Sequence, residues 1–143
     1  MASLSPHVQF EYDATHKVFA VRAVGEMDDE IFKACYAMAG RLVQGLDVRA
    51  AFFDLTNVRR FSVSAATIRH VSTLSPVLPD PTPRYVIASQ DHIYGMARMF
   101  QIVSPRGRDN LRVVRTQKDA YDALGLTAAA EFQRVAEPPD TTS

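Results

Sequence analysis

The chain of 143 residues contains one cysteine, no tryptophan and no excess of either charge. A single cysteine, Cys35, excludes an intrachain disulfide and a zinc site built from four cysteines. Sixteen basic and sixteen acidic side chains give a formal net charge of zero, which disfavours nucleic-acid binding through overall positive charge. We therefore expect neither a disulfide scaffold nor a nucleic-acid partner.

Long apolar runs are also missing. The apolar stretch from Val18 to Val24 is interrupted by Arg22, and no run approaches the roughly 20 residues that span a bilayer. The first residues lack a basic region followed by an apolar region, which is the pattern of a secretory signal. We therefore expect no membrane span and a cytoplasmic protein.

Signatures of cofactor and metal sites are absent as well. Neither the glycine-rich phosphate loop nor the dinucleotide-binding pattern occurs. The histidines, at positions 7, 16, 70 and 92, form no close pair at the spacing of a metal site. Cys35 lies on the apolar stripe of a predicted helix, which is typical of a core residue rather than of a catalytic nucleophile. We expect no metal, no cofactor and no enzymatic activity.

What is present fits one folded α/β domain, because hydrophobic residues make up 47% and charged residues 22% of the chain. Two β-prone segments joined by a polar turn predict an N-terminal hairpin. Helices and strands then alternate, which favours a mixed, mostly parallel sheet of four or five strands. The expected order is β-β-α-β-α-β-α-β-α, with strands at 7–12, 18–24, 50–55, 85–88 and 111–114 and a first helix at 28–43.

The end of the chain differs from the rest in composition. Residues 1–126 are expected to form the single domain, and residues 127–143 a C-terminal extension. Alanine-rich residues 127–135 predict a short helix, and the remaining residues, rich in proline and threonine, predict a disordered tail.

The stretch from Asp54 to Thr67, DLTNVRRFSVSAAT, joins a predicted strand end, a loop and a helix start. It resembles the central signature of the STAS superfamily, the SpoIIAA-like fold of anti-sigma-factor antagonists. That signature is a hydrophobic strand, Asp-Leu-Ser/Thr, a hydrophobic anchor, and then Asp-Ser-Ser-Gly opening a helix. The frame is matched by Asp54, Leu55, Thr56, Val58 and Phe61, whereas Asp-Ser-Ser-Gly is replaced by Ser-Val-Ser-Ala at 62–65.

The later segments resemble a divergent STAS-like subgroup, and the resemblance spans about residues 8–126. The resemblance implies an α/β domain that regulates or binds a protein partner without catalysis. The subgroup has no single activity that can be carried over. The STAS fold is also similar to the lipid-binding CRAL-TRIO fold, which implies that a small apolar ligand is conceivable.

Ser64 is the candidate phosphorylation site, because it corresponds to the serine that a partner kinase modifies in classical members. A phosphate at a helix N-terminus interacts favourably with the helix dipole and the free N–H groups, and it repels a docked partner. The alternative is that Ser64 only caps the helix, a role worth about 1 kcal/mol.

The loop before Ser64 is the candidate partner-binding surface. Its two arginines either attract an acidic partner or a phosphate, or are simply solvated. The expected partner is a regulatory protein or a second copy of the chain, the latter if the proline-rich segment 75–83 exposes an apolar strip. The partner-binding candidates are Asp54, Thr56, Arg59, Arg60 and Ser62.

Five arginines between residues 98 and 115 stand against the single acidic residue Asp109. They either form a basic patch for an acidic protein, an anionic headgroup or a nucleotide, or pair with the acidic first helix and solvent. They motivate an alternative function, a carrier for a small apolar or anionic ligand between the sheet and the helix at Met96–Phe100. The anion-binding candidates are Arg98, Arg106 and Arg108.

Overall fold

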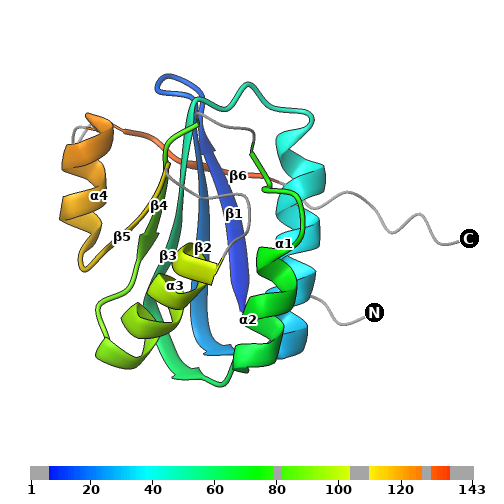
Figure 1. Cartoon of the computed structure of the whole chain (residues 1–143). Coiled ribbons are helices and arrows are strands. Elements are labelled where there is room, and N and C mark those ends of the chain that lie inside the picture. Colours follow the sequence, from blue (N-terminus) through cyan, green and yellow to red (C-terminus); the bar gives the residue numbers. More distant parts are fainter. Residues whose placement is uncertain (1–6, 79–81, 104–109, 127–129, 136–143) are drawn as a thin grey trace, which may run out of the picture.

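The computed structural model describes residues 7–78, 82–103, 110–126 and 130–135. Within these ranges the chain forms a six-stranded mixed sheet and four helices (Figure 1). The strand order in the sheet is β5-β4-β3-β2-β1-β6. The elements are β1 (Val8–Asp13), β2 (Val18–Met27), α1 (Asp29–Val43), β3 (Ala50–Phe61), α2 (Ala65–Ser72), β4 (Arg84–Ile87), α3 (Asp91–Val103), β5 (Leu111–Val114), α4 (Gln117–Leu124) and β6 (Gln133–Arg134).

The predicted hairpin and parallel core are both confirmed. Strands β1 and β2 are antiparallel, and the pairs β2–β3, β3–β4 and β4–β5 are parallel. The hairpin turn is held by the buried carboxylate of Asp13, which accepts hydrogen bonds from the N–H groups of Thr15 (2.9 Å) and His16 (3.1 Å). The turn ends at Lys17, the one non-glycine residue with positive φ among those described. The order of elements therefore follows the prediction up to α4.

Helices cover both faces of the sheet. Helices α1, α2 and α3 lie on one face, and α4 lies on the other (Figure 1). The strands alternate accordingly, so that Phe19 and Val21 of β2 face the three helices whereas Val18 and Ala20 face α4. None of the helices in the described ranges is long and apolar enough to cross a bilayer.

The sheet has six strands rather than the four or five expected, because the C-terminal extension contributes β6. We expected a short helix within 127–135, but Gln133 and Arg134 pair antiparallel with Tyr12 and Glu11 of β1. An outer strand offers unpaired N–H and C=O groups, and pairing with them holds Gln133 and Arg134 in an extended conformation. Residues 127–129 and the predicted tail at 136–143 lie outside the described residues.

Strand β3 is longer than expected. The sequence predicted a strand to residue 55 and then a loop, whereas β3 continues to Phe61 alongside β2. The register shifts twice, between Arg22 and Val24 and between Gly25 and Glu26, where Gly25 has a φ of +80°. Over this second half of the strand Val58 is buried, whereas the two residues on each side of it are exposed. Asp54 therefore lies within β3 and not at its end.

Candidate functional site

Ser64 is the N-cap of α2 and is exposed at the surface. Its backbone is extended, and its hydroxyl oxygen accepts a hydrogen bond from the Thr67 N–H at 3.1 Å. This is the geometry by which a serine satisfies a free N–H group in the first turn of a helix. The capping role expected for Ser64 is therefore present in the structure.

Ser64 also joins α2 to α1. Its backbone N–H donates to Oδ1 of Asp29 at 2.7 Å, and its hydroxyl donates to Oδ2 of the same carboxylate at 3.0 Å. Asp29 is the first residue of α1, directly after the N-cap Asp28. The hydrogen bond from the Ser64 N–H, with those from the Ser64 and Thr67 hydroxyls, lowers the pKa of Asp29 below its usual value. A single carboxylate thus lies between the N-termini of two helices.

Four of the predicted partner-binding residues are exposed close to Ser64 in the chain. Thr56, Arg59 and Arg60 lie on the second half of β3, and Ser62 lies between this strand and α2. The segment from Val58 to Val63 is anchored to the core by these two buried valines. We call the residues Thr56, Arg59, Arg60, Ser62 and Ser64 the β3–α2 surface.

Asp54 is not part of that surface, because its side chain is buried in an ion-pair network beneath α4. Its carboxylate accepts hydrogen bonds from the Thr56 N–H (2.9 Å) and from Nη1 of Arg22 (3.1 Å). Arg22 also donates to Glu11 at 2.7 Å and to the Tyr121 hydroxyl at 3.1 Å. Asp54 therefore holds the backbone of β3 and the neighbouring strand β2 in place.

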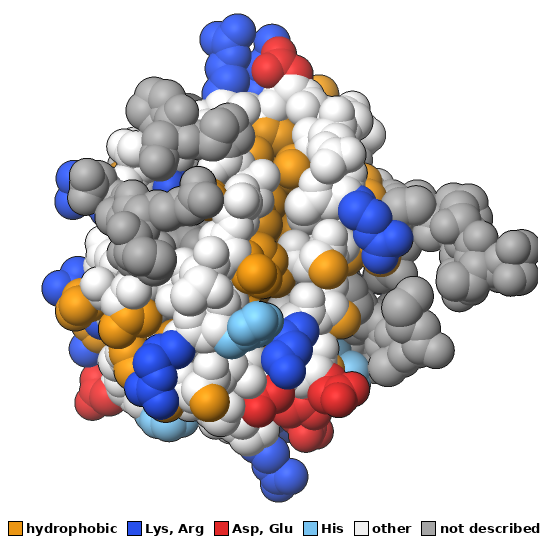
Figure 2. Space-filling view, turned by 45° about the vertical axis from the view of Figure 1, so that its right-hand side comes forward, with side chains coloured by type: hydrophobic (Ala, Val, Ile, Leu, Met, Phe, Trp, Pro, Cys, Tyr) orange, Lys and Arg blue, Asp and Glu red, His pale blue; other side chains and the backbone are white. Residues whose placement is uncertain are grey.

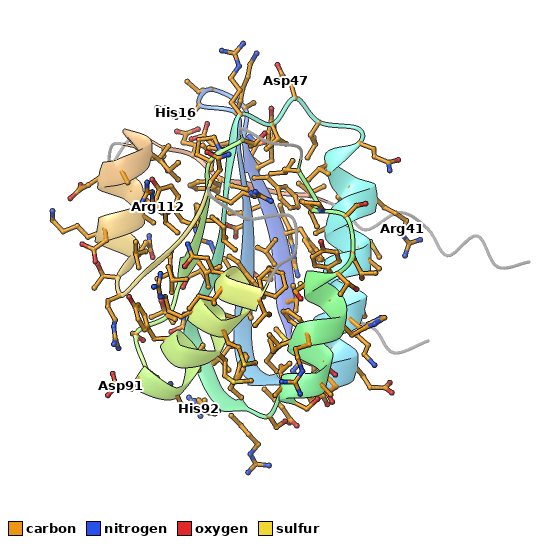
Figure 3. All side chains as sticks on the ribbon, viewed as in Figure 1. His16, Arg41, Asp47, Asp91, His92 and Arg112 are labelled. Atoms are coloured by element: carbon orange, nitrogen blue, oxygen red, sulfur yellow. The ribbon has the colours of Figure 1, made fainter. Side chains whose placement is uncertain are left out.

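The predicted arginine patch divides among several local contacts. Arg98 is exposed and donates to Gln101 at 2.6 Å, one turn further along α3. Arg115 pairs with Asp91 at 2.7 Å and lies 3.9 Å from the ring centre of Tyr94. Neither arginine uses the acidic first helix as its partner in these contacts. Arg112 lies exposed on β5 (Figure 3), and Arg106 and Arg108 lie outside the described residues.

A cavity of about 160 Å³ lies between the sheet and helices α1, α2 and α3. Its walls are almost wholly apolar, and the space-filling view shows a strip of hydrophobic side chains on the face that these helices cover (Figure 2). The position agrees with the ligand site expected beside Met96–Phe100, but Ala97 and Phe100 line it rather than the methionines. Other lining residues include Phe19, Val21, Cys35 and Ile68.

Cys35 and the histidines show no catalytic arrangement in the described part of the chain. Burial raises the pKa of the Cys35 thiol to about 12, so the thiolate that a nucleophile needs is not formed at neutral pH. His16 is bonded to Asp13, and His92 lies against the Phe61 carbonyl. No three metal-ligating side chains come together among the residues described.

Comparison with solved structures identifies the fold. The chain is similar to an uncharacterized protein of the DUF3478 family from Shewanella loihica, whose crystal structure has a SpoIIAA-like fold. The TM-score is 0.52 at 17% identity, over 87% of this chain and 98% of that chain. This chain has the SpoIIAA-like fold. The resemblance seen in the sequence is thereby confirmed at the level of the fold.

A second similar structure is the Bacillus cell fate determinant SpoIIAA in its phosphorylated form. The TM-score is 0.47 at 17% identity, over 82% of this chain and 98% of that chain. No family model and no curated protein matches this SpoIIAA-like chain by sequence.

Proposed function

We propose that the protein is a non-enzymatic regulatory domain that binds a protein partner at the β3–α2 surface and is switched by phosphorylation of Ser64. The observation that carries this proposal is the position of the Ser64 hydroxyl. It is exposed at the N-terminus of α2, and its oxygen lies 3.0 Å from the Asp29 carboxylate of α1. A covalent change at this atom therefore acts on two helices at once.

A phosphate on Ser64 would bring up to two negative charges against the Asp29 carboxylate. The free N–H groups and the dipole of α2 attract the phosphate, so the phosphate stays at α2 and Asp29 has to leave. The two hydrogen bonds between Ser64 and Asp29 are lost in the process. Phosphorylation would thus separate the N-terminus of α1 from that of α2.

The partner that fits the β3–α2 surface is an acidic face of another protein. Arg59 and Arg60 are exposed and supply positive charge on the stretch of chain that leads to Ser64. A phosphate at Ser64 would neutralise this charge and repel an acidic partner. We therefore propose that the unphosphorylated chain binds the partner and that phosphorylation releases it.

The docking part of the proposal is tested with the double variant Arg59→Ala/Arg60→Ala, purified as the full chain from its own host. The matched control is Arg41→Ala, because Arg41 is exposed on α1 and points away from the sheet (Figure 3). We expect a partner protein to co-purify with the wild type and the control, and to be lost from the double variant. Retention of the same partner by the double variant, or its absence from the wild type, would contradict the docking surface.

The switch is tested by placing phosphoserine at position 64 in the wild type and in Asp29→Asn. We expect phosphorylation to lower the unfolding temperature of the wild type, because two like charges meet. The drop in unfolding temperature should be smaller in Asp29→Asn, where a neutral amide replaces the carboxylate. Equal losses in the two backgrounds would show that the phosphate does not act through Asp29.

Two of the expected alternatives receive less support. The first is a carrier in which an arginine holds the charged end of the ligand. Arg98 does not fit that role, because it is exposed and does not line the cavity. For self-association through the proline-rich segment, Val77 is half-buried and Leu78 is buried against the core. Pro83 is exposed, but the larger apolar side chains described there face inward, which gives a homodimer through this segment less support.

A further inference from the structure

We propose that the cavity between the sheet and helices α1–α3 is a binding site for a small, neutral, apolar molecule about the size of one aromatic ring. This site is independent of the proposed switch, because neither Ser64 nor Asp29 lines it. The role of the cavity can therefore be tested while the docking surface is left intact.

The size of the cavity supports a ligand rather than a packing defect. Protein interiors are packed as tightly as organic crystals and contain few voids larger than a water molecule. A cavity of about 160 Å³ is far above that limit. An engineered cavity of about 150 Å³, lined by leucine, isoleucine and phenylalanine, stays dry and binds benzene. The present cavity matches it in volume, and it is also partly open to the surface, which gives a ligand a way in.

The walls decide the chemistry of the ligand. The sheet contributes Phe19 and Val21, and α3 contributes Phe100, so that aromatic and branched apolar side chains surround the space. Water gains little in such a site, because a buried water needs two to four polar partners.

Polar groups at the edge of the cavity do not change this conclusion. The Tyr36 hydroxyl donates to the Ser75 carbonyl at 2.5 Å and is thus engaged outside the cavity. Arg84 lies in the wall and is buried. An anion would have to give up its hydration to reach this arginine through apolar surroundings, which is costly. A neutral ligand avoids that cost, and we therefore assign the site to an uncharged molecule.

The test uses toluene as the probe and variants that fill the cavity. Ala39→Leu adds three carbon atoms to the α1 wall, and Ala97→Leu does the same from the α3 wall. Ala37→Leu is the matched control, because it makes the same change on an exposed position of α1. Toluene binding is measured by calorimetry, and folding of each variant is checked by circular dichroism.

We expect saturable binding of toluene to the wild type and to Ala37→Leu, with a rise in unfolding temperature. Each filled variant should bind at least about tenfold more weakly, equivalent to about 1.4 kcal/mol. Since each wall has its own variant, failure of one to fold leaves the test intact.

Three results would overturn the inference. They are the absence of saturable toluene binding to the wild type, unchanged binding in folded Ala39→Leu and Ala97→Leu, and tighter binding of benzoate than of toluene. The variant Arg59→Ala/Arg60→Ala separates this inference from the proposed function. It should bind toluene as the wild type does, whether or not it retains a protein partner.

Discussion

Arg22 is the centre of the polar network on the face of the sheet beneath α4. It bonds to Glu11, Asp54 and Tyr121, and its guanidinium lies 5.1 Å from the ring centre of Phe52. The network joins the neighbouring strands β1, β2 and β3 to α4. Buried charges are tolerated only where they are paired, so each member of the network depends on the others.

Replacing Arg22 by methionine should destabilise the protein by about 3 kcal/mol, because it leaves the buried Asp54 carboxylate without its cation. Asp54→Asn in the same chain should recover part of this loss, so that the double variant is more stable than the sum of the single changes predicts. Urea denaturation of the four proteins measures the coupling. Strict additivity would contradict a direct ion pair between the two residues.

Asp13 makes stability depend on pH. Burial raises the pKa of this carboxyl, but hydrogen bonds from His16 and Thr15 outweigh burial, and the pKa lies below its usual value. A lowered pKa stabilises the fold at pH values above the unfolded pKa of about 3.9, and this contribution is lost as the pH falls through the folded pKa.

Asp13→Asn should therefore be less stable than the wild type at pH 6, and the difference should shrink towards pH 3. Thermal unfolding at the two pH values measures it, with Asp122→Asn, an exposed carboxylate on α4, as the control. A difference that stays constant or grows on acidification would contradict the role given to the ionised carboxylate.

At the scale of elements, β6 and the residue before it link the C-terminal extension to the sheet. Phe132 lies 5.6 Å from the ring of Phe52 and 6.2 Å from that of Tyr121. Its burial and the pairing of β6 with β1 together cover the outer edge of the sheet. We therefore infer that the domain extends beyond residue 126.

Phe132→Ala should lower the free energy of unfolding by about 2 kcal/mol, because a half-buried aromatic ring and its contacts are lost. Gln133→Ala, at an exposed position of β6, should change it much less. Urea denaturation compares the two variants with the wild type. Equal effects, or no effect of Phe132→Ala, would place the domain boundary at residue 126 as the sequence alone suggested.

The elements that were predicted well from the sequence are those whose residue pattern lies within the element itself. Helix α1 was expected at 28–43 from the spacing of its apolar residues, and the structure has it at Asp29–Val43. The extension of β3 to Phe61 and the strand β6 both depend on pairing with residues far away in the chain. Local propensity contains no information on such partners, which explains why both were missed.

For the whole molecule, the order of elements predicted the α/β class, and the resemblance of residues 54–67 and the later segments to the STAS superfamily predicted the SpoIIAA-like fold. The candidate site was predicted in part. The capping position of Ser64 follows from its place before a helix, but its contact with Asp29 depends on how α1 and α2 pack. A ligand pocket beside the helix at Met96–Phe100 was expected as an alternative, but its lining was not, because apolar helix stripes indicate a core and do not indicate how completely the core is filled.

The most direct test of the central claim is native mass spectrometry of the full chain purified gently from its own host. We expect two populations, an unmodified chain in complex with a partner protein and a chain about 80 Da heavier, modified at Ser64 and free of that partner. An unmodified chain detected without a bound partner, or a chain phosphorylated at Ser64 that keeps its partner, would contradict a regulatory domain switched at this residue.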